Sequence, residues 1–398
     1  MAAKPFVSYL RKQNPEHFTS QGKFRNEPIR FDIKETKRIK KKKKREIVES
    51  LGSSVGSVLA VGEGEEEKET EFEQEESKSA EADEKKLMAL RAAIPSLPAD
   101  LFDEKELRQI GKGAYGKVYV VKHAKTKETI VVKRIAASSP SAVAKVVREA
   151  AILRHVKSFC KPYLLCGGDL YQTPTEFWIV TEFLGNYETL NNIKTLRLTD
   201  PERIEICEML VFAVAQLHKA RVAHRDIKPE NVMVAKLERK LNIKVLDFGE
   251  ACLSTDCQTK EVVGTPLYMA PEVLAIGPDS ILLDNQPVET RVAMTFEFWV
   301  AADLWSLGVT LLEFLMGTDV FYQRILQATD LSSQKLQVSC SLLSWSKTGI
   351  PKDVWLDLFQ SHYLSATLKV YIGDRIMHLL DFEPARRALT LFPPIVPS

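Results

Sequence analysis

The sequence predicts an α+β domain of two lobes, a β-rich N-lobe and a mainly α-helical C-lobe, behind a disordered N-terminal arm. Short β-branched runs separated by turns fill residues 106–135. Apolar residues then recur at helical spacing, most clearly from Pro201 to Lys219. The predicted bounds are 1–100 for the arm and 104–392 for the domain, with the N-lobe over about 104–182 and the C-lobe over about 185–392.

The arm carries two opposed blocks of charge. Residues 1–50 hold 15 Lys and Arg against 6 Asp and Glu, and residues 63–86 hold 12 acidic against 4 basic residues. Such density of like charge disfavours a buried core. The basic run at 37–45 fits a nuclear localisation signal, a contact with nucleic-acid phosphates, or a solvated charge cluster. No aromatic residues interleave there for base stacking, so nucleic acid remains a weakly supported alternative partner.

Cysteine usage and hydropathy predict an intracellular protein of the nucleus, the cytoplasm or both. No two cysteines have C-x-x-C spacing, so a zinc site is not indicated and free thiols are expected for all six: Cys160, Cys166, Cys207, Cys252, Cys257 and Cys340. The first ten residues lack the apolar core of a signal peptide. Three acidic residues interrupt the apolar stretch Met294–Met316, which predicts a buried helix rather than a membrane span. No membrane partner is expected, and the oligomeric state is not predicted.

A glycine-rich turn joins the first two predicted strands. Residues Gly111 to Val118 follow the pattern G-x-G-x-x-G-x-V. Glycines let a hairpin backbone approach phosphates and donate N–H groups to them, although such a pattern alone often marks only a tight turn. Because it lies between strands rather than at the start of a helix, it favours a phosphate-covering loop over a dinucleotide-binding unit.

A lysine and a glutamate sixteen residues apart form a candidate ion pair. Lys133 follows the apolar strand residues 130–132, and Glu149 lies on the amphipathic helix predicted over 141–156. Each alone reads as a solvated charge. Together they can place an ammonium group on the α- and β-phosphates of a nucleotide.

The strongest local signal is His224-Arg225-Asp226, with Asn231 five residues after the aspartate. A carboxylate beside a phosphate site can accept a hydroxyl proton or orient a nucleophile. The Asn231 amide oxygen can share magnesium with a second carboxylate, which Asp247-Phe248-Gly249 supplies. These elements occur in order and are followed by Ala270-Pro271-Glu272, which argues against a chance match.

From about Glu104 to Phe392 the chain resembles the eukaryotic protein kinase family, in its serine/threonine branch. The resemblance implies transfer of the γ-phosphoryl group of ATP, with Mg²⁺, to protein Ser and Thr hydroxyls. It implies four catalytic residues: Asp226 as the base, Lys228 at the γ-phosphate, Asn231 as a metal ligand, and Lys133. Asp247 would be the second metal ligand. Lys228, and Thr265 facing Asp226, are typical of the serine/threonine branch.

The resemblance also implies an ATP site between the lobes. Val118, Val131 and Met233 would enclose adenine, Thr181 would guard the pocket behind it, and Glu182–Leu184 would be the hinge. The full predicted set is Ile110, Gly111, Lys112, Gly113, Ala114, Tyr115, Gly116, Lys117, Val118, Val131, Lys133, Glu149, Thr181, Glu182, Leu184, Glu188 and Met233.

Further implied roles are structural. Asp303 would brace the backbone of the catalytic loop, and Arg387 would pair with Glu272 in a buried ion pair. Leu153, Phe248 and His224 would stack as an apolar spine. Each of these residues also reads simply as ordinary core.

The implied regulatory residues are Arg225, Thr259, Glu261 and Thr265. Arg225 normally pairs with a phosphate on the activation segment, and Glu261 occupies the usual phosphorylated position. We expect Glu261 to stand in for the phosphate in part, because one carboxylate has less charge than a phosphate group. Thr259 is the alternative phosphorylation site, and an exposed loop glutamate without a role is an equal alternative for Glu261.

Several positions depart from the family pattern. Val131 replaces the usual alanine, and Glu250 replaces an apolar residue, which leaves the preference between serine and threonine open. Residues 277–295 read as an insertion, which loops tolerate at small cost. Glu188 and Glu230 fit recognition of a basic substrate residue, or ribose binding or plain surface. An active kinase and a pseudokinase scaffold both remain open, although Lys133, Asp226 and Asp247 are all present.

Overall fold

The computed structural model describes residues 85–113, 116–160, 162–193, 196–238, 240–257, 262–276, 294–318, 320–321, 364–381 and 383–389. Predictions for the arm up to residue 84, for Ala114, Tyr115, Thr259 and Glu261, and for residues 277–293 of the insertion lie outside these ranges. The chain divides into two units, Val7–Met88 and the rest, and both lobes described below belong to the second unit.

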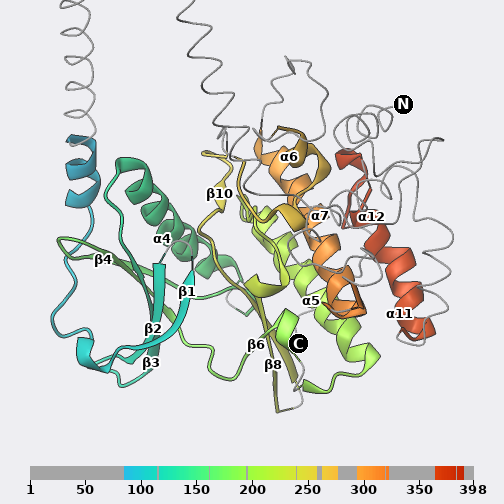
Figure 1. Cartoon of the computed structure of the whole chain (residues 1–398), viewed down its shortest axis with the longest axis horizontal. Helices are drawn as coiled ribbons and strands as arrows, with labels where there is room; N and C mark the ends of the chain where they lie inside the picture. The colour runs from blue at the N-terminus through green and yellow to red at the C-terminus, as the bar shows by residue number, and fades with distance from the viewer. Residues whose placement is uncertain are drawn as a thin grey trace, which may run out of the picture. The chain divides into compact units, whose positions relative to one another are not determined.

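The N-lobe is an antiparallel five-stranded sheet covered by one long helix, α4 (Pro140–Cys160) (Figure 1). The strand order is β1-β2-β3-β5-β4. In this register Lys133 lies opposite Val118 on one side and Ile179 on the other. The strands are β1 (Arg108–Gly113), β2 (Gly116–Lys122), β3 (Thr129–Ile135), β4 (Gly167–Gln172) and β5 (Phe177–Glu182), preceded by the 3₁₀ turn η2 (Glu104–Glu106).

The segment before the first strand also packs on the N-lobe. A helix covers residues 85–92. The Leu97 N–H donates to the carbonyl of Gln172 at 2.8 Å. Leu101 and Phe102 are buried against the sheet, with the Phe102 ring 5.6 Å from that of Trp178. Ordered structure therefore extends upstream of the predicted domain start at 104.

The C-lobe is mainly helical, with two small antiparallel sheets, β6-β8-β9 and β10-β7, beside the helices. Its helices are α5 (Asp200–Lys219), α6 (Pro271–Ile276), α7 (Phe296–Met316), α11 (Ala366–Tyr371) and α12 (Met377–Leu379). Its strands are β6 (Glu188–Thr189), β7 (Val222–Ala223), β8 (Val232–Leu237), β9 (Lys240–Val245) and β10 (Cys252–Leu253). Shorter helical turns are η3 (Leu190–Asn192), η5 (Pro229–Asn231), η6 (Pro266–Tyr268), η7 (Ile372–Ile376, a π-helix) and η8 (Pro384–Arg386). The predicted α+β, two-lobed fold is confirmed.

Helix α7 forms the centre of the C-lobe. It begins where the Thr295 hydroxyl accepts the N–H of Phe298 at 3.3 Å, and it ends at Gly317, whose φ of 83° suits glycine. In the part of the chain that the structure describes, α7 is the one helix long and apolar enough to cross a membrane, and 78% of its most apolar window is buried inside the domain. The prediction of a buried helix here is confirmed.

The prediction of free thiols is wrong for two of the six cysteines. Cys252 and Cys257 form a disulfide, with their Cα atoms 5.1 Å apart. No pattern in the sequence predicts this disulfide, because five residues of separation match no standard pairing or metal-binding spacing. Cys166 and Cys207 are buried and not disulfide-bonded, and the side chains of Cys160 and Cys340 lie outside the described residues.

Candidate active site

A cavity of about 480 Å³ lies between the sheet of the N-lobe and the first strands of the C-lobe. It is lined by residues from β1, β2, β3, α4 and β5 above, and by residues around β8 and β9 below. The predicted site residues that line it are Ile110, Gly113, Gly116, Val118, Val131, Lys133, Glu149, Thr181, Glu182, Leu184, Asp226, Lys228, Asn231, Met233 and Asp247.

Three lining residues were not predicted: Leu165, Ile179 and Leu246. Two had a signal in the sequence. Ile179 is two residues from Thr181 on β5 and shares its face, and Leu246 directly precedes Asp247. Leu165 lies in a connecting segment, whose side-chain directions no periodicity fixes. Phe183, which also lines the cavity, belongs to the predicted hinge Glu182–Leu184.

Some predicted residues do not line the cavity. Lys112 and Lys117 face each other across the β1–β2 hairpin with exposed side chains, and Gly111 packs on Val118. Glu188 lies on β6 outside the cavity. Gly116 does line the cavity, and it is also needed for close packing, because a Cβ there would lie 2.4 Å from the carbonyl oxygen of Arg134.

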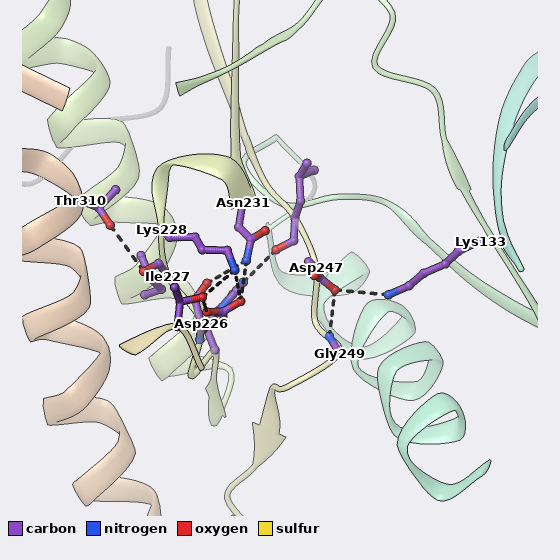
Figure 2. A network of polar contacts seen from close by, with 11 residues as sticks. Lys133, Asp226, Ile227, Lys228, Asn231, Asp247, Gly249 and Thr310 are labelled. Carbon is purple, nitrogen blue, oxygen red and sulfur yellow. Dashed lines mark hydrogen bonds and ion pairs between the residues drawn. The ribbon is translucent and has the colours of Figure 1, made fainter. Parts of the chain in front are cut away.

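Lys133 bridges the two lobes through two carboxylates. Its Nζ lies 2.7 Å from Glu149 Oε1 on α4 and 3.3 Å from Asp247 Oδ1 (Figure 2 shows the second contact). Burial alone would lower the Lys133 pKa, but the charges of Glu149 and Asp247 outweigh it and raise that pKa above its ordinary value. Lys133 is therefore a fixed cation in the cavity wall.

Asp226 is the centre of a second polar cluster. Its Oδ2 accepts from Lys228 Nζ at 2.7 Å, and its Oδ1 accepts from the Thr265 hydroxyl at 2.7 Å. Lys228 Nζ also donates to the Thr265 hydroxyl at 2.8 Å. The predicted meeting of Thr265 with Asp226 and Lys228 is therefore present. Figure 2 shows the Asp226 carboxylate and the Lys228 ammonium group side by side, and both residues line the cavity.

The backbone of this loop is held by Asp303 at the core of α7. Its two carboxylate oxygens accept the N–H groups of His224 and Arg225 at 2.7 and 2.8 Å. Arg225, within this loop, has a φ of 65°, a conformation that non-glycine residues rarely adopt. The buried carboxylate thus stabilises a loop shape that the backbone alone disfavours.

These motifs match a known family model. The model described as protein kinase domain matches residues 105–355. The chain belongs to the protein kinase family. A relative from Caenorhabditis elegans, provisionally named ribosomal protein S6 kinase alpha-2, is 32% identical over 301 residues, which cover 72% of this chain. That stretch covers 34% of the relative, so the chain spans about a third of the relative's length.

The apolar and ionic supports typical of a kinase are also in place. Leu153, His224 and Phe248 are almost fully buried, and the rings of the last two lie 5.3 Å apart. Arg387 donates to both oxygens of Glu272, at 2.6 and 2.8 Å, and its guanidinium lies over the ring of Trp305. The Glu272–Arg387 pair predicted from the sequence is therefore present.

The described surroundings of Arg225 include two groups that the sequence did not predict. Its predicted partner Glu261 lies outside the described residues. Within the described part of the chain, the guanidinium donates to the backbone carbonyl of Glu250 and lies 5.0 Å from the ring centre of Trp299. The negative charge of Glu250 also stabilises the charged form of the Arg225 guanidinium. Glu250, noted only as an unusual residue, therefore belongs to the environment of Arg225.

Asn231 and Asp247 are suited to a hard cation such as Mg²⁺, which prefers oxygen ligands and few carboxylates. The Asn231 amide nitrogen donates to the backbone and side chain of Asp226, so its oxygen is the atom left for a cation. Burial alone would raise the Asp247 pKa, but the charge of Lys133 holds it below its ordinary value. The described residues contain no cluster of three His, Cys, Asp or Glu for a metal, so this pair would leave the other coordination positions to phosphates and water.

Proposed function

We propose that the chain is a serine/threonine protein kinase that transfers the γ-phosphoryl group of Mg-ATP to Ser and Thr hydroxyls of proteins. The observation that carries this proposal is the Asp226 cluster, where Lys228 and Thr265 both hydrogen-bond the same carboxylate within the cavity wall. That combination of an acceptor for a proton and a cation for a phosphate suits phosphoryl transfer.

In this proposal each residue has one task. Asp226 accepts the proton of the acceptor hydroxyl as that oxygen bonds to the γ-phosphorus and the bond from phosphorus to the bridging oxygen of ADP breaks. Lys228 stabilises charge on the transferred group, and Lys133 holds the phosphates that remain on the nucleotide. Asn231 and Asp247 would hold magnesium, which supplies charge neutralisation on the phosphates when bound.

The nucleotide end of the cavity supports ATP as the donor. Val118, Val131 and Met233 line it with apolar side chains, and Leu184 lies at the segment that joins the lobes. Val131, which is larger than the alanine usual at this position, lines the cavity without closing it. ATP and Mg²⁺ are therefore the proposed substrate and cofactor.

Transfer of radiolabel from [γ-³²P]ATP to a mixture of acceptor proteins that carry exposed Ser and Thr residues tests this function. We expect incorporation with magnesium and none after the metal is chelated with EDTA, because Asn231 and Asp247 then have no ion to hold. A folded protein that binds Mg-ATP but transfers nothing to any acceptor would instead support the pseudokinase alternative.

We further propose that the substrates carry a basic residue near the acceptor. Glu230 is exposed beside the catalytic loop. Its negative charge helps to raise the pKa of Glu313, a buried glutamate of α7. Burial raises the pKa of Glu313 to about 7, even though Tyr268 donates a hydrogen bond to it at 2.8 Å. A guanidinium group of a substrate bound to the exposed carboxylate of Glu230 would relieve its repulsion with the buried Glu313.

Glu230→Gln is expected to lower kcat/KM about tenfold for a peptide with arginine upstream of the acceptor, but not for its alanine counterpart. In the unmodified protein this arginine preference should rise from about pH 6 to about pH 8, since Glu313 loses its proton across that window. The variant should show no such rise. Glu205→Gln, at an exposed carboxylate of α5, is the control. Equal kinetics on both peptides at every pH would contradict the proposal.

Localisation in the nucleus or cytoplasm and a contact between the basic run and nucleic acid stay predictions from the sequence of the arm. The proposed kinase activity depends on neither.

A further inference from the structure

The disulfide between Cys252 and Cys257 closes a short loop three residues after Asp247-Phe248-Gly249. Both cysteines are 0% exposed. The loop has a defined shape, because the Asp256 side chain accepts the Leu253 N–H at 2.7 Å and the Asp256 N–H donates to the Leu253 carbonyl at 2.9 Å. We call residues 252–257 the disulfide loop.

One end of the disulfide loop is attached to the strand that leads into the catalytic loop. In the β10–β7 pair, Cys252 lies opposite Ala223 and Leu253 opposite Val222. The Ser254 N–H donates to the Arg221 carbonyl at 2.9 Å. Ala223 directly precedes His224, so the position of the disulfide loop is coupled to the start of the catalytic loop.

The other end of the disulfide loop contacts α4 and α7. Arg148 Nε lies 3.0 Å from Asp256 Oδ2, and Arg148 directly precedes Glu149, the partner of Lys133. The indole N–H of Trp299 donates to the Cys257 carbonyl at 3.2 Å. The disulfide loop therefore connects three parts of the site: the catalytic loop, α4 and the central helix.

We propose that Cys252 and Cys257 form a reversible redox modification site, in which the disulfide form holds α4 in its active position and the dithiol form releases it. This inference rests on the proposed kinase function for its consequence, but not for the chemistry of the cysteines. Disulfides that meet a reducing thiol pool are usually transient or redox-sensing, so reversible reduction is the role that this proposal gives to the bond.

The chemistry requires a two-electron partner. In reduction, local opening of the disulfide loop first exposes the buried sulfurs, and a thiolate of a dithiol reductant then attacks one sulfur and breaks the Cys252–Cys257 bond. The other sulfur leaves as a thiolate that takes up a proton. The second thiol of the reductant then displaces the first cysteine, so the protein gains two electrons and two protons while the reductant becomes a disulfide. In oxidation, hydrogen peroxide accepts the same two electrons and two protons and yields two water molecules.

The consequence for activity follows from the weakness of the remaining contacts. The Arg148 and Asp256 side chains are 26% and 36% exposed, and an ion pair that is partly open to solvent is weak unless its partners are already held in place. The disulfide supplies this constraint by limiting the conformations of the loop. Without it, Asp256 no longer holds Arg148 in place, and Glu149 is positioned less firmly against Lys133.

The test uses the full chain, oxidised with hydrogen peroxide or reduced with dithiothreitol. Peptide mapping after alkylation should show a 252–257 link only in the oxidised sample. Reduction should lower kcat/KM for ATP on the order of fivefold, and reoxidation should restore it. The Cys252→Ala/Cys257→Ala double variant should have the same activity as the chemically reduced chain, and neither reagent should change that activity. Cys207→Ala, at a buried cysteine outside the disulfide, is the matched control and should respond as the unmodified chain does.

Hydrogen exchange in α4 separates this inference from the proposed function. Amide exchange over residues 140–157 should be faster in the reduced form, whether or not the chain transfers phosphate. If the oxidised chain is inactive yet α4 loosens on reduction, the proposed function fails and the redox site stands. Absence of the 252–257 link after oxidation, or a link that forms and breaks with no change in α4 exchange or activity, would overturn the redox site. If the double variant does not fold, comparison of the unmodified chain after reduction and after reoxidation tests the redox site in the same way.

Discussion

Asp226→Asn is expected to lower kcat for phosphoryl transfer about a thousandfold, in the range usual for loss of a general base. Asparagine keeps the shape of the side chain, but it offers one amide oxygen in place of the two carboxylate oxygens that accept from Lys228 and Thr265 at 2.7 Å each. It cannot take the proton of the acceptor hydroxyl. The affinity for ATP should therefore stay close to that of the unmodified protein. Steady-state kinetics and a separate measurement of the ATP dissociation constant check the two parts of this result.

Asp169→Asn is the matched control, because Asp169 is an exposed aspartate on β4, outside the lining of the cavity. Its kcat should equal that of the unmodified protein. If Asp226→Asn retained more than about a tenth of the original kcat, Asp226 would not be the catalytic base.

Arg387→Met is expected to lower the free energy of unfolding by about 3–5 kcal/mol. The side chain of Arg387 is fully buried and donates to Glu272, to the Asp381 carbonyl and to the Ala301 carbonyl. Removing it leaves the Glu272 carboxylate, 16% exposed, without its charged partner. Urea denaturation followed by tryptophan fluorescence measures the difference.

The neighbouring residue gives a control for this variant. Arg386 is exposed, so Arg386→Met should change the unfolding free energy by no more than about 0.5 kcal/mol. Adding Glu272→Leu to Arg387→Met should recover part of the loss, since a buried pair replaced by apolar residues leaves no unpaired charge. An Arg387→Met protein as stable as Arg386→Met would show that the pair contributes nothing.

The catalytic residues were predictable because they belong to short sequence motifs with fixed spacing. Asp226, Lys228 and Asn231 lie within six residues of one another, and Asp247 follows a strand that ends at Val245. To predict that Lys133 pairs with Glu149, it was enough that a strand carries a lysine and the next helix carries a glutamate. Such local patterns fix both residue type and approximate position.

Contacts between distant segments were harder to predict. Glu313 reads as one of three acidic residues that interrupt an apolar helix, and only packing shows that it is buried beside Tyr268 with a raised pKa. Leu97 falls within the predicted arm, and only the structure shows that its N–H donates to the carbonyl of Gln172 on β4. The Cys252–Cys257 pair depends on a turn that brings two side chains together, and no spacing rule specifies that turn.

The acceptor residue tests the central claim most directly. Two peptides that differ only in carrying serine or tyrosine at the acceptor position are incubated with the full chain, magnesium and [γ-³²P]ATP, and the labelled amino acid is identified. The arrangement of Lys228 and Thr265 around Asp226 predicts label on serine and none on tyrosine. Label on tyrosine, or no label on either peptide from a folded protein that binds Mg-ATP, would contradict the account.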